Sequence, residues 1–318
     1  MIPENTTISQ ANLMGSIWMV AAMAAFAVED ALIKATAGLL PVGQVLVLFG
    51  FGGALVFAIT AARNRDRFFG PAIQSSAMRY RMLFEVAGRV FYALAVALTP
   101  LSATTVILQA TPLVVVAGAA VVFGERVGLR RWTAIWVGLA GVVIVVGPGR
   151  DTFSMLSMLA VLGMLGFAGR DLTSRAAPKS VSTAVLGLYG FVAVFLAGIV
   201  IAVWDSKPFI WPTSTTSTYL SAAIGVGVIA YSFLMKAMRT GEVSAVTPFR
   251  YSRLLFGIGL GVYWFGEKFS LEMLIGSALI VTSGLILMTR KRIAIRPRKN
   301  PAYELELPSL SATESNES

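Results

Sequence analysis

Residues 183–203 read TAVLGLYGFVAVFLAGIVIAV, a run that contains no charged side chain. An apolar stretch of about 18 residues or more is typical of a helix that crosses a lipid bilayer. Similar runs recur along nearly the whole chain. They predict ten membrane spans, at residues 12–33, 43–62, 82–98, 103–123, 131–147, 154–174, 183–203, 216–236, 243–265 and 271–289. The predicted fold class is therefore an all-α integral membrane protein.

The composition agrees with a protein whose solvent is lipid. Of 318 residues, 56% are hydrophobic and 13% are charged, whereas soluble domains carry roughly 25% charged residues. Histidine and cysteine are both absent, so a disulfide, a zinc-thiolate site, a cysteine nucleophile and a histidine base are excluded. We expect no catalytic residue, no metal and no cofactor, and we do not expect an enzyme.

Loop charges predict the orientation of the spans. The net charge is +10, but most of it lies in short loops and in the tail rather than in a nucleic-acid-binding patch. The loops after the second, fourth, sixth and eighth spans are basic, and the loops between them are neutral or balanced. Because basic loops stay on the cytoplasmic side, both termini should be cytoplasmic, in a bacterial-type inner membrane. Residues 1–11 and the basic, polar tail 290–318 are the predicted cytoplasmic ends.

An internal repeat underlies this pattern. A shift of 142 residues superposes the Gly-Glu-Arg string at 124–126 on the Gly-Glu-Lys string at 266–268, and a shift of 141 superposes Asp30 on Asp171. The predicted repeats are residues 12–147 and 154–289, with five spans each. An odd number of spans inverts the second repeat relative to the first, and inverted repeats build many secondary transporters.

Several short motifs carry a family resemblance. They are Ala-x-x-Ala-Phe-Ala-x-x-Asp-x-x-x-Lys at residues 22–34, Pro112, Phe-Gly-Glu-Arg at 123–126, Gly138 with Gly141, and Phe-Gly-Glu-Lys at 265–268. With these motifs the chain resembles the drug/metabolite transporter superfamily, EamA type, over residues 12–289. The resemblance implies ten helices around a central cavity formed by spans 1, 3, 4, 6, 8 and 9, with spans 5 and 10 at the periphery. It also implies a substrate such as an amino acid, S-adenosylmethionine, riboflavin, a sugar or an amine. The chain departs from this family in its unusually many intramembrane arginines.

Charged residues inside spans are candidate functional residues, since each costs about 2.5–3.5 kcal/mol at the bilayer centre. Glu85 and Arg89 lie four residues apart on one helix face, followed by Tyr92. They form either an internal ion pair or a site in which Arg89 binds an anionic group while Glu85 accepts a proton or an amine.

Arg250 and Arg253 flank Tyr251 in a span without an acidic residue. Their counter-charge must come from Glu85 or Asp171, or from the substrate itself. Arginine binds carboxylate or phosphate in a bidentate way, so the arginine pair is the strongest predicted substrate site; pairing across helices only is the structural alternative. The remaining predicted substrate-binding residues are Gln109 and Trp18, although an aromatic residue in a span more often contacts lipid or packs against its neighbours.

Two aspartates near span ends repeat the same pattern. Asp30 precedes Lys34 by four residues, and Asp171 precedes Arg175 by four. Each pair would stabilise a helix end, or the two aspartates would act as alternating gates. With Glu29 and Glu85 they are the candidate proton-coupling carboxylates. Pro112 and Pro248 should kink their helices and are candidate hinges.

The favoured function is a secondary transporter that moves a small zwitterionic or anionic metabolite by alternating access. Its expected partners are the substrate, membrane lipid, and a proton or a counter-exchanged substrate, but not nucleic acid; the protein would be a monomer or a homodimer. The alternatives are an integral-membrane enzyme acting on lipid and a non-transporting membrane partner subunit. The first would need a nucleophile or metal cluster that the sequence does not contain, and the second would need a domain that reads out a signal.

Overall fold

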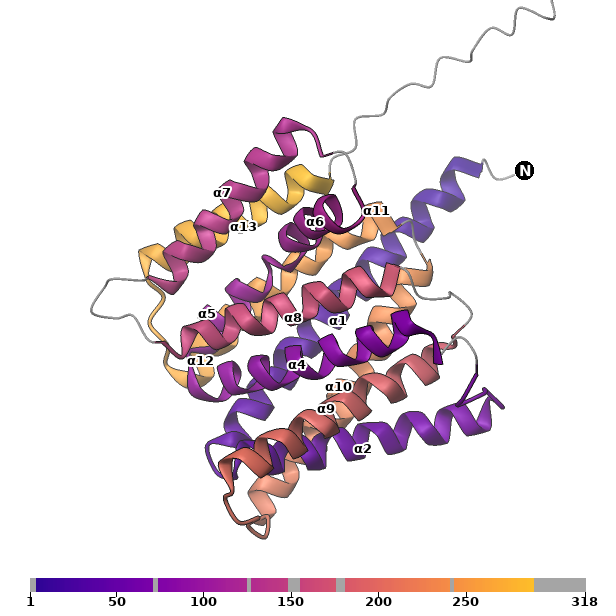
Figure 1. The fold of residues 1–318 in the computed structure, drawn as a ribbon, viewed down its shortest axis with the longest axis vertical. Coiled ribbons are helices and arrows are strands. Elements are labelled where there is room, and N and C mark those ends of the chain that lie inside the picture. The colour runs from indigo at the N-terminus through magenta and orange to yellow at the C-terminus, as the bar shows by residue number, and fades with distance from the viewer. Residues whose placement is uncertain are drawn as a thin grey trace, which may run out of the picture. The chain divides into compact units, whose positions relative to one another are not determined.

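The computed structural model describes residues 4–70, 74–124, 127–147, 155–175, 181–240 and 243–288. Every regular element within these ranges is a helix (Figure 1). The helices are α1 (Glu4–Ala37), α2 (Val42–Arg63), α4 (Ser76–Leu98), α5 (Leu101–Leu108), α6 (Thr111–Val122), α7 (Leu129–Val146), α8 (Ser157–Arg175), α9 (Thr183–Asp205), α10 (Ser214–Thr240), α11 (Val243–Val246), the 3-10 helix η1 (Thr247–Tyr251), α12 (Ser252–Phe265) and α13 (Leu271–Met288). Most of the predicted N-terminal segment is thus the first part of α1, and the predicted tail lies outside the described residues.

Each of the ten predicted spans coincides with a helix or with a broken helix. Within the described ranges, seven helical segments are long and apolar enough to cross a membrane, with α5 and α6 taken together. Three predicted spans fall outside this set. Two of them, α4 and α8, carry several charged residues that lower their hydropathy, and the third is interrupted between Val243 and Phe265. The charged residues within the bundle thus lie mainly in the helices whose hydropathy is least suited to contact with lipid.

The two predicted repeats interleave. The main packing pairs are α1 with α10, α2 with α9, α4 with α8, and α7 with α13 (Figure 1). Every pair joins a helix of the predicted first repeat to a helix of the second. In the two repeats α1 corresponds to α8, α2 to α9, α4 to α10, and α7 to α13. When each helix is replaced by its counterpart, the α1–α10 pair becomes the α8–α4 pair, and the α2–α9 and α7–α13 pairs are unchanged. This is the pattern expected of inverted repeats related by a pseudo-two-fold axis.

Glycines bring these paired helices into close contact. A Cβ atom added to Gly166 on α8 would lie 2.5 Å from the Cα of Gly88 on α4. A Cβ atom added to Gly141 on α7 would lie 2.8 Å from the carbonyl oxygen of Gly276 on α13. Small residues at helix crossings allow backbones to approach one another in lipid, where apolar side chains provide no hydrophobic driving force. The glycines therefore permit the close approach of these paired helices.

Two helices are broken near the centre of the bundle. The chain leaves the helix at Gln109 and Ala110, between α5 and α6, and Pro112 lies in the first turn of α6. In the second half, Pro248 lies in the 3-10 helix between α11 and α12. Proline cannot donate a backbone hydrogen bond and its ring clashes with the preceding turn. The predicted kinks at the two prolines are confirmed, whereas the hinge function stays a prediction.

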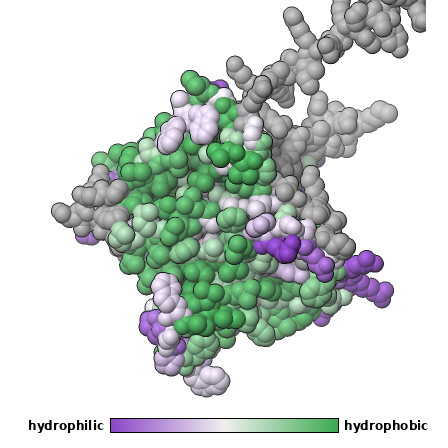
Figure 2. Space-filling view, in the orientation of Figure 1, coloured by the Kyte–Doolittle hydropathy of each residue, from purple (hydrophilic) through white to green (hydrophobic). Residues whose placement is uncertain are grey.

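The outer surface is apolar. Figure 2 shows a face covered mainly by hydrophobic residues, with hydrophilic residues at its margins. Large apolar side chains such as Val121, Trp136 and Leu255 are more than half exposed. A soluble monomer rarely exposes apolar patches of more than a few hundred Å². Together with the apolar helices, this surface identifies a multi-pass membrane protein.

Candidate functional site

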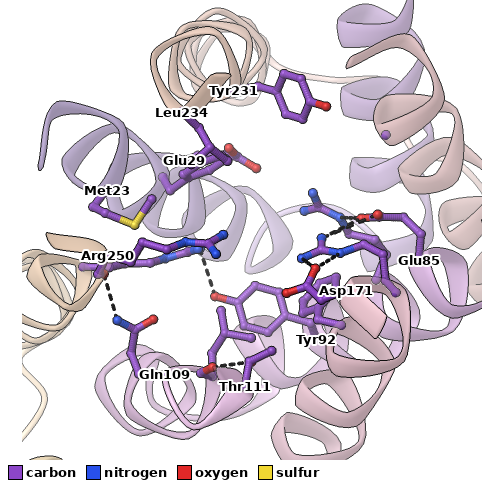
Figure 3. Close-up of a pocket in the computed structure, with 18 of the residues that line it drawn as sticks. Met23, Glu29, Glu85, Tyr92, Gln109, Thr111, Asp171, Tyr231, Leu234 and Arg250 are labelled. Carbon is purple, nitrogen blue, oxygen red and sulfur yellow. Dashed lines mark hydrogen bonds and ion pairs between the residues drawn. The ribbon is translucent and has the colours of Figure 1, made fainter. Parts of the chain in front are cut away.

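A cavity of about 260 Å³ lies inside the bundle (Figure 3). Small-molecule sites typically measure about 300–1,000 Å³, so the cavity suits a small ligand. All six spans that the family resemblance implies contribute to it, through α1, α4, α5–α6, α8, α10 and η1–α12. Phe49 on α2, Phe191 on α9 and Met288 on α13 also line it, which the resemblance did not imply; α7 contributes none of the lining residues.

Helix α4 has Arg81 in its first half and is followed by Thr99 and Pro100, and we call the corresponding ends of the bundle the Arg81 end and the Pro100 end. The lining includes Arg81 and Met288, near the Arg81 end, and reaches Tyr92 and Arg253 in the opposite direction. The cavity therefore extends from the middle of the bundle toward the Arg81 end.

An ion-pair cluster occupies one wall of the cavity. Arg89 Nε lies 3.5 Å from Glu85 Oε1, and Arg170 Nη1 lies 3.2 Å from the same oxygen. Arg170 Nη2 also lies 2.8 Å from Asp171 Oδ1. Both guanidinium groups stand over the ring of Phe167, at 5.5 and 4.9 Å from its centroid. We call these residues the Glu85 cluster. The predicted Glu85–Arg89 pair is present, and Arg170 joins it from the opposite half.

A second network closes the cavity toward the Pro100 end. Arg253 Nη2 lies 2.5 Å from Asp30 Oδ2, and the Tyr92 hydroxyl donates to the same oxygen at 2.8 Å. Arg253 also donates to the Tyr92 hydroxyl oxygen at 3.3 Å. The prediction that Glu85 or Asp171 would neutralise Arg253 is therefore wrong. The partner is Asp30, because α1 packs against α12 and brings this buried carboxylate to the arginine.

Lys34 does not pair with Asp30, contrary to the predicted contact between residues four apart. Its Nζ donates to the carbonyl oxygens of Val96 at 3.2 Å and Thr99 at 2.6 Å. The last carbonyls of a helix have no partner within the helix and carry partial negative charge, so the end of α4 attracts this ammonium group. The corresponding residue in the second half is Arg175, the last residue of α8, whose side chain is not among those described.

Glu267 caps a helix at the Pro100 end. Its carboxylate accepts from the Leu101 and Ser102 backbone amides at 2.6 and 2.9 Å, and from the Ser102 hydroxyl at 2.7 Å. A carboxylate at a helix N-terminus accepts otherwise unpartnered amides and interacts favourably with the helix dipole. The sequence showed only a charged loop here. The offset of 142 residues pairs Glu267 with Glu125, which lies outside the described residues.

Two charged groups of the cavity lack a protein partner among the described residues. Glu29 is 3% exposed, and its Oε2 atom is buried with no hydrogen bond. Arg250 makes no side-chain hydrogen bond or ion pair in the same part of the chain, although the Gln109 amide donates to its backbone oxygen at 2.9 Å. Figure 3 shows both side chains at the cavity, across from Glu85 and Asp171.

The other predicted site residues divide into two groups. Tyr251 and Pro112 line the cavity together with Gln109, and the Tyr251 hydroxyl is buried without a hydrogen-bond partner. Trp18 is not a lining residue: its ring lies 4.9 Å from that of Phe233, and Lys236 Nζ lies 3.9 Å above it. Pro248 is also absent from the lining. The structure thus brings together all the predicted substrate-binding residues except Trp18.

Sequence reasoning missed two arginines. Arg170 is central to the Glu85 cluster, and Arg81 lines the cavity at its own end. Arg170 could have been found because it precedes Asp171 within an apolar span, but Arg81 resembled an ordinary loop charge. With them, the described lining holds five arginines and three carboxylates, and Asp30 behind Arg253 makes a fourth. Counted over these described residues, the site carries one more positive than negative charge.

Comparison with known proteins agrees with this architecture. The chain is 24% identical over 300 residues to a riboflavin transporter of Rhizobium johnstonii, covering 91% of this chain and 95% of that one. It is 21% identical over 279 residues to an S-adenosylmethionine uptake transporter of Rickettsia prowazekii, covering 87% and 92%. Among the solved structures that match the fold is a crystal structure with a TM-score of 0.59 at 20% identity, covering 87% of this chain and 97% of that one.

The family comparison is the most direct. The model of the EamA-like transporter family matches the chain twice, at residues 13–147 and at residues 155–289. These two matches together span well over half of the 318 residues. They agree with the internal repeat, the interleaved helix pairs and the charged cavity at the centre of the bundle. The chain belongs to the EamA-like transporter family.

Proposed function

We propose that this protein is a secondary transporter that carries a small organic metabolite with an anionic group across a bacterial inner membrane. The proposal rests mainly on the position of the Arg250 guanidinium group. It lies in the cavity, and within the described ranges it has no carboxylate at ion-pair distance. A substrate carboxylate or phosphate would supply the counter-charge through two parallel hydrogen bonds.

The relatives narrow the class of substrate. Proteins named riboflavin transporter and S-adenosylmethionine uptake transporter are similar to this chain over most of its length. Riboflavin carries no formal charge, whereas S-adenosylmethionine carries the carboxylate of an amino acid. Because an unpaired guanidinium in a low-dielectric site favours an anionic partner, we favour the amino-acid-like and S-adenosylmethionine-like candidates over the riboflavin-like one.

The proposed mechanism is alternating access of two inverted halves across ten spans. At the Pro100 end, Glu267 and the Asp30–Arg253 pair join the two halves, and Lys34 ties α1 to the end of α4 within the first half. The cavity extends toward the Arg81 end, where the loop that follows α2 is rich in arginine. By the positive-inside rule that end is cytoplasmic, so we assign an inward-facing state with both termini in the cytoplasm.

Coupling to a proton would need a carboxylate that is free to accept one. Among the four candidates, Glu85 and Asp171 pair with Arg170, and Asp30 pairs with Arg253. Glu29 has no such partner in the described part of the chain. We therefore regard Glu29 as the carboxylate that either a proton or a positively charged group of the substrate would reach first.

Transport by purified protein in proteoliposomes tests the proposal. A library of amino acids, S-adenosyl compounds and flavins should contain at least one compound that accumulates or exchanges. Arg250→Ala should lower the uptake of that compound by about tenfold or more, since a hydrogen bond to a charged group contributes about 1.5–3 kcal/mol. Arg130→Ala, at an exposed arginine near the start of α7, serves as the control. Equal uptake by both variants would remove Arg250 from the site.

A further inference from the structure

We infer that the cavity has two poles and selects zwitterions: Arg250 takes the carboxylate of the substrate and Glu29 takes its cationic amine. This inference rests on the proposed transport function and adds a cation-binding residue to it. Neither group has a side-chain hydrogen bond or an ion pair with another described residue. They do not pair with each other, so a ligand that carries both charges is needed to neutralise both.

Glu29 forms the negatively charged pole of the cavity. Its carboxylate is 3% exposed and lines the cavity, and one of its oxygens is buried without a hydrogen bond. Such an oxygen costs free energy until a donor reaches it. Arg89 and Arg253 act on it electrostatically, but neither donates a hydrogen bond to it, and their ion pairs are with Glu85 and Asp30 respectively.

Gly227 packs closely against this carboxylate. A Cβ atom on Gly227 would lie 3.2 Å from Glu29 Oε2, and 3.0 Å from the ring of Phe49. Glycine is costly inside a helix such as α10, but a larger residue here would press against both Phe49 and the carboxylate. A substrate ammonium group must reach Glu29 past these close neighbours, so a side chain at position 227 would hinder it.

The pole at Arg250 is positioned by the broken helices. Its backbone oxygen accepts from Gln109 at the break between α5 and α6, which anchors the residue from the opposite half. The guanidinium remains available in the cavity (Figure 3). Because Gln109 engages the main chain and leaves the side chain free, the anion-binding group is held in place without being neutralised.

A cavity with one anion-binding and one cation-binding group also discriminates against ligands that carry only one charge or none. A monoanion would satisfy Arg250 but would leave the Glu29 carboxylate buried and unpaired, and a monocation would do the reverse. A neutral flavin would leave both groups unpaired. Specificity is a difference between affinities, and unpaired buried charge is an effective penalty against competitors. The cavity therefore discriminates by the number and sign of charges more than by the skeleton that carries them.

Matched ligand sets test the two poles. Each set holds a zwitterion, its desamino acid and its decarboxylated amine, built on methionine, on phenylalanine and on S-adenosylhomocysteine; riboflavin serves as the neutral probe. Inhibition of transport in proteoliposomes is measured for wild type, Glu29→Gln and Arg250→Gln. In wild type, the best zwitterion should bind at least tenfold more tightly than either of its truncated relatives. Glu29→Gln should lose only the preference for the amine, and Arg250→Gln only the preference for the carboxylate.

The controls separate this inference from the proposed function. Asp205→Asn removes an exposed carboxylate that pairs with Lys207 and should leave both preferences intact. If Glu29→Gln does not fold, Gly227→Ala should weaken amine recognition in the same way without changing any charge. Transport of riboflavin or a monoanion in preference to every zwitterion would overturn the two-pole site and leave the transporter intact. Failure to transport any compound would instead count against the proposed function.

Discussion

Asp30 and Arg253 form the most buried ion pair of the cavity, with side chains 5% and 14% exposed. Removing one member leaves the other as an uncompensated buried charge, which typically costs about 3–5 kcal/mol. We therefore expect Arg253→Ala to lower the melting temperature of the purified protein markedly. Asp30→Asn combined with Arg253→Gln should recover most of that loss. If Arg253→Ala melts like wild type, the pair contributes little to stability.

The sequence predicted local charge pairs better than distant ones. Glu85 and Arg89 lie on one helix at a spacing that makes them neighbours, so their contact could be predicted from the sequence. Asp30 and Arg253 are 223 residues apart, and nothing in a single sequence indicates that α1 packs against α12. Lys34 was misassigned for a related reason: the carbonyls at the end of α4 compete with Asp30 for it, and they become its neighbours only in the fold.

At the scale of elements, α5 depends on a residue from outside its own half. Glu267→Ala would remove three hydrogen bonds to the first turn of α5, and hydrogen bonds to a charged group contribute about 1.5–3 kcal/mol. The Pro100 end should then open more often. We expect Thr105→Cys, which is buried against Gly257 of α12, to react with a membrane-impermeant maleimide about tenfold faster in the Glu267→Ala background.

The control for this prediction is a second acidic residue close by in sequence. Glu272→Ala changes a carboxylate in the first turn of α13 that does not cap α5. It should leave the labelling of Thr105→Cys at the rate seen without it. The absence of cysteine from the natural chain makes the added thiol the only reactive one. Equal rates in the two backgrounds would show that Glu267 does not hold the Pro100 end closed.

The elements themselves were largely predictable. Apolar length located α2, α9 and α13 to within a few residues, because lipid imposes that pattern directly. The breaks at Pro112 and Pro248 followed from proline chemistry. The cap at Glu267 did not follow, since a carboxylate in a loop shows no sequence signal for the amides that it will meet.

At the scale of the whole molecule, the orientation in the membrane can be tested with added cysteines. Ser206 follows α9 at the Pro100 end, and Asn64 follows α2 at the Arg81 end; both are exposed. The positive-inside rule predicts that Ser206→Cys reacts with impermeant maleimide from outside intact cells and that Asn64→Cys does not. Permeabilised cells should label both. The reverse pattern in intact cells would invert the proposed topology.

The offset between the halves predicted inverted repeats, but it did not indicate how closely the repeats would be interleaved. Helix α1 finds its main partner in α10, and α4 finds its partner in α8. The cavity lies between these pairs, so neither half encloses it alone. A repeat visible in sequence therefore does not imply two separable domains, because each half exposes faces that only the other half covers.

The distribution of charge among the helices has a consequence for biosynthesis, in which spans emerge from the ribosome one after another. Helix α4 carries Glu85 beside Arg89, and α8 carries Asp171 beside Arg170, so each enters the translocon with its own counter-ion. The segment from Val243 to Phe265 carries two arginines and no acid. Its partner, Asp30, was made more than two hundred residues earlier. Asp30 therefore has no Arg253 to pair with until the ninth predicted span has been synthesised, so this ion pair can form only late in the assembly of the bundle.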